Sequence, residues 1–283
     1  MPEITAAMVK SLRDKTNLPM MDCKKALVEC DGDMEKAIEK LRADFKNVAI
    51  KKGEREAAEG LIGFYHDPSS KTAAIVEVRC ESAPVTKSDA FIKLCEDIAK
   101  QIVEKNPKDI DDLMAQKFIG DEKLTISDRL TEVIGLIQEN MKVARFHRGS
   151  GEIGTYLHHD GSVGVLLEVE GENADPTVLK DICMHIAATN PPAGTREDLP
   201  AEMVEKEKAL FKTQMDADPK NAKKPANIIE NILTGKLNKW YGENVLLEQP
   251  FVKDDSKKVG DLLKAGNLKF VRFTRYRVGE VVE

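Results

Sequence analysis

Residues 151–156, Gly-Glu-Ile-Gly-Thr-Tyr, repeat residues 60–65, Gly-Leu-Ile-Gly-Phe-Tyr, which lie 91 positions earlier in the chain. At the same offset, residues 164–169 (GVLLEV) match residues 73–78 (AAIVEV). Each copy therefore holds two apolar runs of strand length with turn-forming residues between them, which predicts a β-hairpin. A repeat of this length is far too long for a solenoid, so the pattern indicates two pseudo-equivalent units that share one core.

The two copies continue alike beyond the hairpin. After the second strand each carries an apolar helical run, and Cys183 in one run matches Cys95 in the other. Further along, residues 267–273 (NLKFVRF) match residues 140–146 (NMKVARF), which gives each unit a returning strand. This order predicts, in each unit, an antiparallel three-stranded sheet with helices on one face, which is an α+β fold.

The sequence outside the duplicated core is helical. Short apolar periodicities separated by turns predict a three-helix bundle of the ubiquitin-associated (UBA-like) type at the N-terminus, and such bundles are more often interaction modules than enzymes. A charged stretch after the bundle predicts a solvated helical linker. The expected units are a UBA-like module at 1–45, a linker at 46–59, core subdomain 1 at 60–149, core subdomain 2 at 150–192 with 243–283, and an inserted helical hairpin at 193–242.

The inserted hairpin is expected in only one of the two units, so it should project from the body. Its two helices flank a predicted turn, Asp218-Pro219-Lys220-Asn221. An apolar stripe on the second helix consists of Ile228, Ile229, Ile232, Leu233 and Leu237. The stripe can hold the two helices together or form the seam of a homodimer. The first interpretation needs no partner and is favoured.

Capping residues predict where several helices begin. Asp22 and Asp33 fit the N-caps of the second and third helices of the bundle, and Ser256 fits the start of a short helix before the last strand. Thr125 and Asp128 have the spacing of a capping box. The helix that this box begins is expected to run to about residue 141.

Composition excludes some classes of protein. The formal net charge is −6 and aromatic residues make up 5% of the chain. This acidic balance argues against direct nucleic-acid binding, because nucleic-acid-binding proteins usually carry a basic face. No apolar run approaches the ~20 residues of a membrane span. The five cysteines form no CxxC pair, so we expect a cytoplasmic protein with buried free thiols and no membrane partner.

Sequence motifs for catalytic chemistry are absent. The chain has no P-loop, dinucleotide-binding, zinc-protease or nucleophile-elbow motif. The adjacent His158 and His159 would point to opposite faces of a strand, so no metal site is expected. His185 is a polar position in an apolar helix, where the other copy has Asp97. It is either hydrogen-bonded within the fold or a contact to a partner. We expect a protein that is not an enzyme and needs no cofactor.

The N-terminal module carries the most specific pattern in the chain. Residues 12–27 read LRDKTNLPMMDCKKAL and are followed by Gly-Asp at 32–33 and Ala-Ile at 37–38. This pattern closely resembles the N-terminal signature of bacterial elongation factor Ts. The likeness continues in residues 185–188 (HIAA) and 249–252 (QPFV), and it covers nearly the whole chain, including the duplicated core and the inserted hairpin.

The resemblance implies a function that the bare pattern does not. Members of this family are guanine-nucleotide exchange factors for elongation factor Tu, the GTPase that delivers aminoacyl-tRNA to the ribosome. The positions that match family contacts with Tu are Lys10 and Lys24 in the N-terminal module, Ser82, Ala83, Pro84 and Val85 after the second strand, and Val163, Gly164 and His185 in the second unit.

The chain departs from the family at the central contact positions. The family carries Thr-Asp-Phe-Val there, with the Asp and Phe wedged between helices beside the nucleotide, whereas this chain has Ser82-Ala83-Pro84-Val85. Ala83 has no carboxylate, and Pro84 is rigid but much smaller than Phe. A buried Phe contributes on the order of 1.5–3 kcal/mol. The chain is therefore either an exchange factor with a reduced wedge or a Tu-binding chaperone or regulator with weak or no exchange. An adaptor unrelated to the family is the third alternative.

Overall fold

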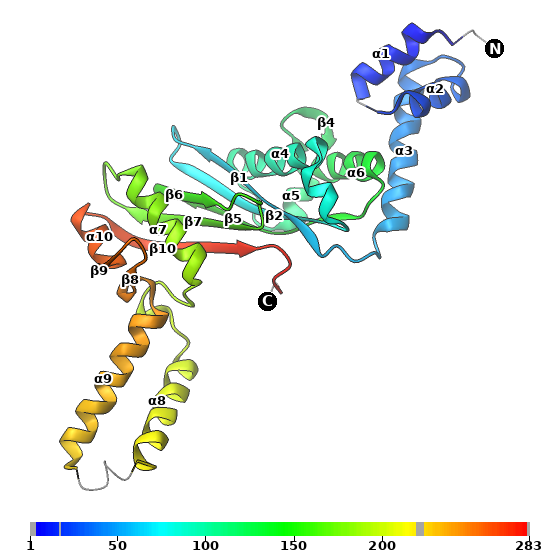
Figure 1. Cartoon of the computed structure of the whole chain (residues 1–283). Coiled ribbons are helices and arrows are strands. Elements are labelled where there is room, and N and C mark those ends of the chain that lie inside the picture. Colours follow the sequence, from blue (N-terminus) through cyan, green and yellow to red (C-terminus); the bar gives the residue numbers. More distant parts are fainter. Residues whose placement is uncertain (1–3, 17, 219–223, 282–283) are drawn as a thin grey trace.

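The structure is a computed structural model that describes residues 4–16, 18–218 and 224–281. Figure 1 shows an elongated molecule with the N-terminal helices at one end, two sheets in the middle and a helical hairpin projecting from the other end. The predicted α+β architecture is confirmed. Asn17 and residues 219–221, which belong to two predicted turns, lie outside the described residues.

The N-terminal bundle consists of α1 (Ala6–Thr16), α2 (Met20–Glu29) and α3 (Met34–Lys52). Asp33 caps α3 as predicted, since its carboxylate accepts hydrogen bonds from the N–H groups of Glu35 and Lys36. The prediction that Asp22 caps α2 is wrong. The helix starts at Met20, with Pro19 at the N-cap position, so Asp22 lies in the first turn.

The third helix connects the bundle to the core without a break. Because α3 runs on to Lys52, the boundary predicted at residue 45 lies inside a helix. Phe45 packs in the bundle core and also lies against Gly135 of α6 (Ile126–Ile137), where an added Cβ would overlap the Phe45 ring. The Lys52 ammonium donates to the carbonyl of Gln138 just beyond α6. The two helices therefore fix the bundle on the first unit.

The first unit is a sheet of β1 (Glu59–Asp67), β2 (Thr72–Cys80) and β5 (Met141–Ser150), antiparallel in the order β1-β2-β5. One face packs on α4 (Asp89–Lys105) and α6 through buried apolar side chains. The sequence between these helices forms α5 (Ile110–Ala115) and a ribbon of β3 (Lys117–Phe118) and β4 (Asp121–Thr125). The predicted capping box of Thr125 and Asp128 begins α6, but the helix ends at Ile137, because the following residues turn into β5.

The second unit repeats this arrangement with β6 (Glu152–Leu157), β7 (Val163–Glu170) and β10 (Lys269–Arg277), in the order β10-β7-β6. Its covering helices are α7 (Pro176–Thr189) and α10 (Val259–Ala265), and its ribbon is β8 (Pro250–Phe251) with β9 (Asp254–Lys258). The duplication thus extends into the ribbon and the last helix. Ser256 does not cap α10 as predicted. It lies in β9, where its hydroxyl donates to Asp254, and α10 starts after Lys258.

The two sheets pack on each other through the faces that carry no helices. Ile62, Ala73 and Ile75 of the first sheet share a buried cluster with Leu166 of the second. The two sheets approach closely at Gly164, where an added Cβ would lie 2.5 Å from the Ile62 side chain. Helix layers therefore cover the outside of a double sheet, with α4 and α6 on one side and α7 and α10 on the other (Figure 1).

The projecting hairpin consists of α8 (Ala201–Asp216) and α9 (Ala226–Asn244). Phe211 of α8 lies under the Lys236 ammonium of α9, 5.4 Å from ring centroid to nitrogen. Near the base, Val204 and Phe211 pack into the same cluster as Trp240. The stripe residues at 229, 232, 233 and 237 are half-buried, and Ile228 is 41% exposed. The two helices therefore pack on each other, and the homodimer seam stays a prediction.

The prediction of buried free thiols is confirmed for four of the five cysteines. Cys23, Cys80, Cys95 and Cys183 are buried free cysteines, while Cys30 is partly exposed. Burial raises the pKa of the Cys80 thiol to about 12 and raises the pKa values of Cys95 and Cys183 further, so none of these three is a ready nucleophile. Within the described residues, no helix has the length and apolar character needed to cross a bilayer.

Candidate partner-binding surface

The N-terminal module presents a cation on an apolar face. Lys10 on α1 and Lys24 on α2 are both exposed, as a contact surface requires. Met20 and Val28 lie one turn before and after Lys24, and they are 43% and 44% exposed. Met21, beside them, is 72% exposed. Residues four apart share one helix face, so α2 offers an apolar strip centred on Lys24. Sequence reasoning assigned these apolar residues no role.

The signal for this strip was present in the sequence. The residues of α2 that pack inward are Cys23, Ala26 and Leu27. Met20, Met21 and Val28 are apolar without belonging to that buried set. Exposed apolar residues gathered on one face mark interaction sites, and Met is adaptable enough to fit an irregular partner surface.

The segment after β2 forms a fixed, outward-facing tip. Residues Ala83–Lys87 make one short 3-10 helix, with Ala83 and Pro84 exposed and Val85 buried in the first core. Ser82 fastens the start of the tip, because its hydroxyl and its N–H donate to the two carboxylate oxygens of Glu139, at 2.6 Å and 3.0 Å. Of the four positions that replace the family's wedge, Ser82 and Val85 therefore anchor the tip, and Ala83 and Pro84 are exposed on it.

A further pair of hydrogen bonds supports the tip from behind. Glu81 accepts from the N–H of Asn140 at 2.6 Å, and the Asn140 amide donates to the carbonyl of Arg55 at 2.6 Å. These contacts join the tip to the segment that follows α3. The chain therefore connects the tip and the N-terminal module through rigid structure.

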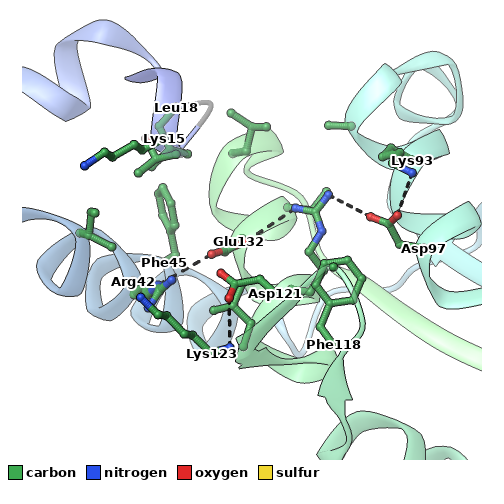
Figure 2. A pocket seen from close by; sticks show the side chains of 18 of the residues that line it. Lys15, Leu18, Arg42, Phe45, Lys93, Asp97, Phe118, Asp121, Lys123 and Glu132 are labelled. Atoms are coloured by element: carbon green, nitrogen blue, oxygen red, sulfur yellow. Dashed lines mark hydrogen bonds and ion pairs between the residues drawn. The ribbon is translucent and has the colours of Figure 1, made fainter. Parts of the chain in front are cut away.

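A groove of 1680 Å³ lies between the module and the first unit. Among its lining residues, Arg129 forms ion pairs with Asp97 at 3.4 Å and with Glu132 at 3.6 Å. Figure 2 shows these two carboxylates among the charged side chains of the groove. Lys93 also pairs with Asp97, at 2.9 Å, and Arg42 approaches Glu132 at 3.9 Å. Burial raises the pKa of Glu132 despite these two arginines. The charges largely neutralise one another and provide no set of catalytic groups.

None of the site residues predicted from the sequence lines this groove. Its walls come from α3, α4 and α6, which are far apart in the sequence. No local motif could have identified the groove, because it exists only once α3 docks on α6.

Val163 and Gly164 lie at the start of β7, at the contact between the two sheets. Val163 is half-buried, while Gly164 is buried beneath Ile62 and Phe64 of β1. The structural requirement at Gly164 is therefore the close approach of the two sheets. Only Val163 has a side chain that could contact a partner from this position.

His185 lies inside the fold and has no exposed surface. Its Nδ1 accepts from the N–H of Val252 at 3.3 Å, so its Nε2 carries the proton and donates to the Gln249 side-chain oxygen at 2.8 Å. Burial lowers the pKa of the imidazole, and the bond to Gln249 only partly opposes this. A direct contact between the His185 side chain and a partner, as the resemblance implies, is therefore not supported. The residue that reaches solvent is Val252, which is 54% exposed.

The first unit has an equivalent of this contact at a different position. The Gln101 amide of α4 accepts from the N–H of Ile119 in the first ribbon and donates to the carbonyl of Lys117, both at 3.0 Å. His185 likewise accepts from a ribbon N–H, that of Val252, but it donates to the Gln249 side chain and not to a ribbon carbonyl. The sequence alignment instead placed Asp97 opposite His185. That pairing was misleading, because Asp97 forms ion pairs near the surface.

His185 should make stability depend on pH in a defined direction. Its pKa in the folded state lies below the ordinary value of 6.5, so the folded protein favours the neutral ring. The contribution of neutral His185 to the free energy of unfolding is complete above the pKa that this residue has in the unfolded state. It is lost as the pH falls from that value towards the lowered pKa of the folded state. We expect the wild type to lose more stability than His185→Gln between pH 7.5 and pH 5.5 in urea titrations. Equal losses would contradict the assignment.

The predicted contact residues lie in three separate places. Lys10 and Lys24 are on the module, Pro84 is on the tip beside the first sheet, and Val163 is in the second sheet. Figure 1 shows these elements spread along the length of the molecule. A partner that contacts all of them must be large enough to reach from the N-terminal module to the second sheet.

Comparisons with known proteins identify the family. The family model for "Elongation factor TS" matches residues 81–280. The chain is 42% identical to "Elongation factor Ts" of Thiobacillus denitrificans, over 100% of this chain and 94% of that protein. Proteins of the same name are similar in Methylococcus capsulatus (42% identical, 99% and 94% covered) and Trichlorobacter lovleyi (39% identical, 99% and 94% covered). With its duplicated core, its N-terminal module and these full-length likenesses, the chain belongs to the elongation factor Ts family.

Proposed function

We propose that this protein is a guanine-nucleotide exchange factor that promotes release of GDP from elongation factor Tu during translation elongation. The observation that supports this most directly is the tip, because Ala83 and Pro84 are exposed in a short 3-10 helix, and by the resemblance they stand at the positions of the family's wedge. The protein has no need of catalytic chemistry of its own. It acts by binding one conformation of its partner more tightly than another.

The mechanism follows from linkage between two binding equilibria. A factor that binds nucleotide-free Tu more tightly than Tu with GDP must weaken GDP binding by the same factor. Acceleration of release by ~10³-fold corresponds to a barrier lowered by about 4 kcal/mol. Contacts that displace the phosphate-binding loop or the Mg²⁺ of Tu can supply such an amount, since the ion is the largest local charge at a nucleotide site.

The structural elements divide this work between them. The α2 strip with Lys24 would hold the partner, and the docked α3 would set the distance from that contact to the tip. Pro84 would then press a rigid, apolar surface against the partner without the ring or the carboxylate of the family wedge. Val163 and Val252 would add a second contact at the other end of the core.

Pro84→Gly is expected to slow the GDP release that the protein stimulates by about tenfold, equal to 1.4 kcal/mol of barrier. Glycine removes both the apolar surface and the fixed φ of the tip. Stopped-flow release of fluorescent GDP from Tu of the same organism measures the effect. Pro68→Gly in the exposed turn between β1 and β2 is the matched control, and its rate should equal that of the wild type.

Two other outcomes have distinct meanings. If the wild type binds Tu tightly but does not accelerate release, the protein is the Tu-binding chaperone or regulator that the altered wedge also allows. If the wild type and Pro84→Gly accelerate GDP release equally, the protein is an exchange factor, but its exchange activity does not depend on the tip.

A further inference from the structure

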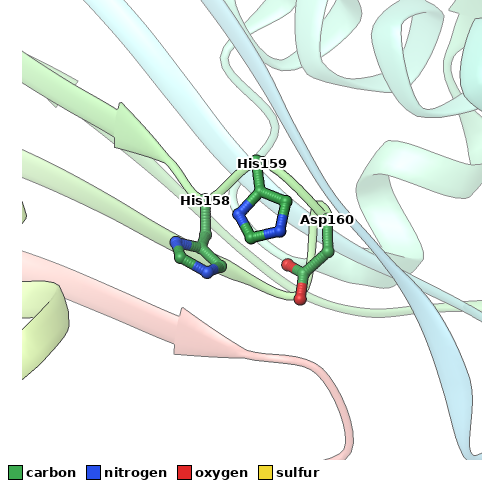
Figure 3. Close-up of side chains that lie close together, drawn as sticks. All are labelled: His158, His159 and Asp160. Atoms are coloured by element: carbon green, nitrogen blue, oxygen red, sulfur yellow. The ribbon is translucent and has the colours of Figure 1, made fainter.

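The turn between β6 and β7 brings three potential metal ligands together. The prediction that His158 and His159 point to opposite faces is wrong, because β6 ends at Leu157 and both histidines lie in the turn. Figure 3 shows their rings gathered with the Asp160 carboxylate. The ring centroids are 4.4 Å apart, and one ligand atom from each of the three residues lies within 4.8 Å of the others.

The backbone of this turn is held from both sides. Within the turn, the N–H of Gly161 donates to the carbonyl of His158 at 2.8 Å, and Gly161 has a φ of +74°. The carbonyl of Gly161 accepts from Ile62 of β1 at 2.9 Å, and the carbonyl of Ser162 accepts from Val278 beyond β10 at 2.9 Å. The turn is thus fixed to both core units, so the three side chains start from a defined backbone.

Neighbouring groups orient two of the three side chains. The Tyr156 hydroxyl is 2.9 Å from Nδ1 of His158, which leaves Nε2 of that ring available. The Ser162 N–H and hydroxyl both donate to Oδ1 of Asp160, at 2.9 Å and 2.7 Å, which leaves Oδ2 available. Partners that fix the unused atom of a ligand are characteristic of metal sites.

We propose that His158, His159 and Asp160 form a binding site for one divalent transition-metal ion, with zinc(II) as the best fit. Two imidazoles and one carboxylate suit Zn²⁺, Co²⁺ or Ni²⁺, whereas Mg²⁺ and Ca²⁺ prefer oxygen ligands only. Around zinc, ligand atoms at 2.0–2.1 Å lie about 3.4 Å apart in a tetrahedron. Small side-chain rotations on the fixed turn close the remaining distance. Three protein ligands leave a fourth position for water or for a group from another molecule.

The site adds a property that exchange on Tu does not require. It lies immediately before Val163, so a bound ion would occupy the surface beside the start of β7. Isothermal titration of Zn²⁺ into the metal-free full-length protein is expected to show one equivalent bound at this turn. Titration with Co²⁺ should give the visible absorption of an ion held by nitrogen and oxygen ligands, without the intense thiolate bands that binding at Cys30 would produce.

Variants of single ligands test the assignment. His159→Ala and Asp160→Asn should each weaken Zn²⁺ binding at least tenfold, and Tyr156→Phe should weaken it by about tenfold because it removes an orienting partner. His66→Ala removes an exposed histidine of β1 outside the cluster and should leave the affinity unchanged. The ligand side chains face solvent, so thermal melts should show that all variants stay folded. Absence of a one-equivalent site, or an affinity that His159→Ala and Asp160→Asn leave intact, would overturn the proposal.

Discussion

Glu77→Gln is expected to lower the free energy of unfolding by about 3–5 kcal/mol, as is typical when one partner of a buried ion pair is removed. Glu77 has no exposed surface. Its carboxylate accepts from Nε of Arg79 at 2.7 Å, from Nε of Arg145 at 2.6 Å and from the N–H of Gly279 at 3.0 Å. Glutamine keeps the shape, but it has no charge and only one acceptor oxygen. Two largely buried guanidinium groups would therefore lose their shared counter-charge.

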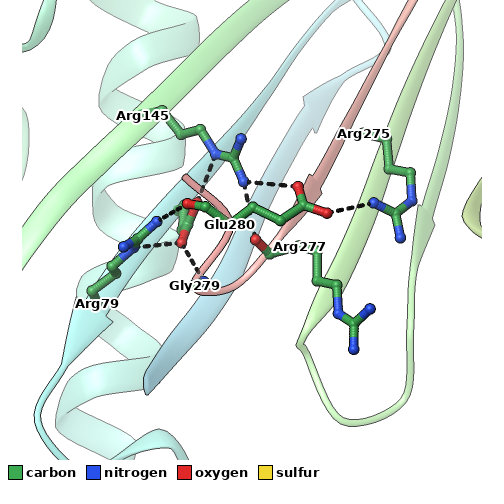
Figure 4. A network of polar contacts seen from close by, with 7 residues as sticks. Arg79, Arg145, Arg275, Arg277, Gly279 and Glu280 are labelled. Carbon is green, nitrogen blue, oxygen red and sulfur yellow. Dashed lines mark hydrogen bonds and ion pairs between the residues drawn. The ribbon is translucent and has the colours of Figure 1, made fainter. Parts of the chain in front are cut away.

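The surroundings of Glu77 also fasten the end of the chain. Figure 4 shows Arg79 donating to the carbonyl of Glu280, and Arg145 and Arg275 pairing with the Glu280 carboxylate. Loss of the charge at residue 77 should loosen this arrangement, so proteolysis near Gly279 should become faster. Both effects are measured on the same preparation, by urea denaturation and by limited digestion.

A matched control comes from a surface pair in the same fold. Glu170 and Lys269 are 3.4 Å apart, with side chains 65% and 79% exposed. Exposed ion pairs contribute at most about 1 kcal/mol, so Glu170→Gln should change the unfolding midpoint little. If both variants cost the same, burial of the charge is not what makes Glu77 important.

The duplicated sequence contained a signal for this buried pair that sequence reasoning did not use. Glu77 and Glu168 occupy matching positions in the second strand of each copy, and Arg145 and Arg272 match in the third. A glutamate within an otherwise apolar central strand needs a partner. In the structure Glu77 of β2 pairs with Arg145 of the neighbouring β5, at 2.6 Å. In the second unit, Nε of Arg272 lies 3.9 Å from the Glu168 carboxylate. The closer partner of Glu168 is Nε2 of His147 from the first unit, at 2.7 Å.

The features that were predicted correctly depend on short stretches of sequence. The strands follow from apolar runs, and the caps at Asp33 and Thr125 require only the next three residues. The wrong predictions concern positions where a neighbouring element decides the outcome. Asp22 has a side chain suited to a cap, but α2 already begins at Met20. Ser256 lies in strand β9 of the second ribbon and not at the start of a helix.

The sequence predicted which positions belong to the candidate site, but not which of their side chains are exposed. The resemblance named Lys10, Lys24 and Pro84, which are exposed, but it could not separate them from His185, which is buried. Burial of His185 depends on Gln249 and Val252, which are more than sixty residues away. The groove likewise depends on how α3 docks on α6. Tertiary contacts, which one sequence does not reveal, decided each of these cases.

Gly135→Ala and Gly235→Ala are the same chemical change inside two helices, and we expect opposite effects on stability. In a helix interior, Ala is more favourable than Gly by roughly 0.5–1 kcal/mol. Gly235 in α9 has nothing within 4 Å of an added Cβ, so Gly235→Ala should stabilise by about that amount. At Gly135 in α6 the Cβ would overlap the Phe45 ring. Overpacking costs about 1–3 kcal/mol, so Gly135→Ala should destabilise. Urea denaturation at one temperature compares the two.

The same pair of variants tests whether exchange needs the module to be held in place. Phe45 belongs to α3, the helix that carries the module on the core, so an added methyl at residue 135 must move α3 away from α6. The proposed mechanism needs Lys24 and Pro84 to contact one partner at a fixed separation. Stimulated GDP release should therefore fall by about tenfold for Gly135→Ala, equal to 1.4 kcal/mol, at a temperature where both variants are folded. Gly235→Ala should match the wild type. A stability loss at residue 135 with an unchanged release rate would mean that the module only recruits the partner, and that the tip acts without a fixed distance to it.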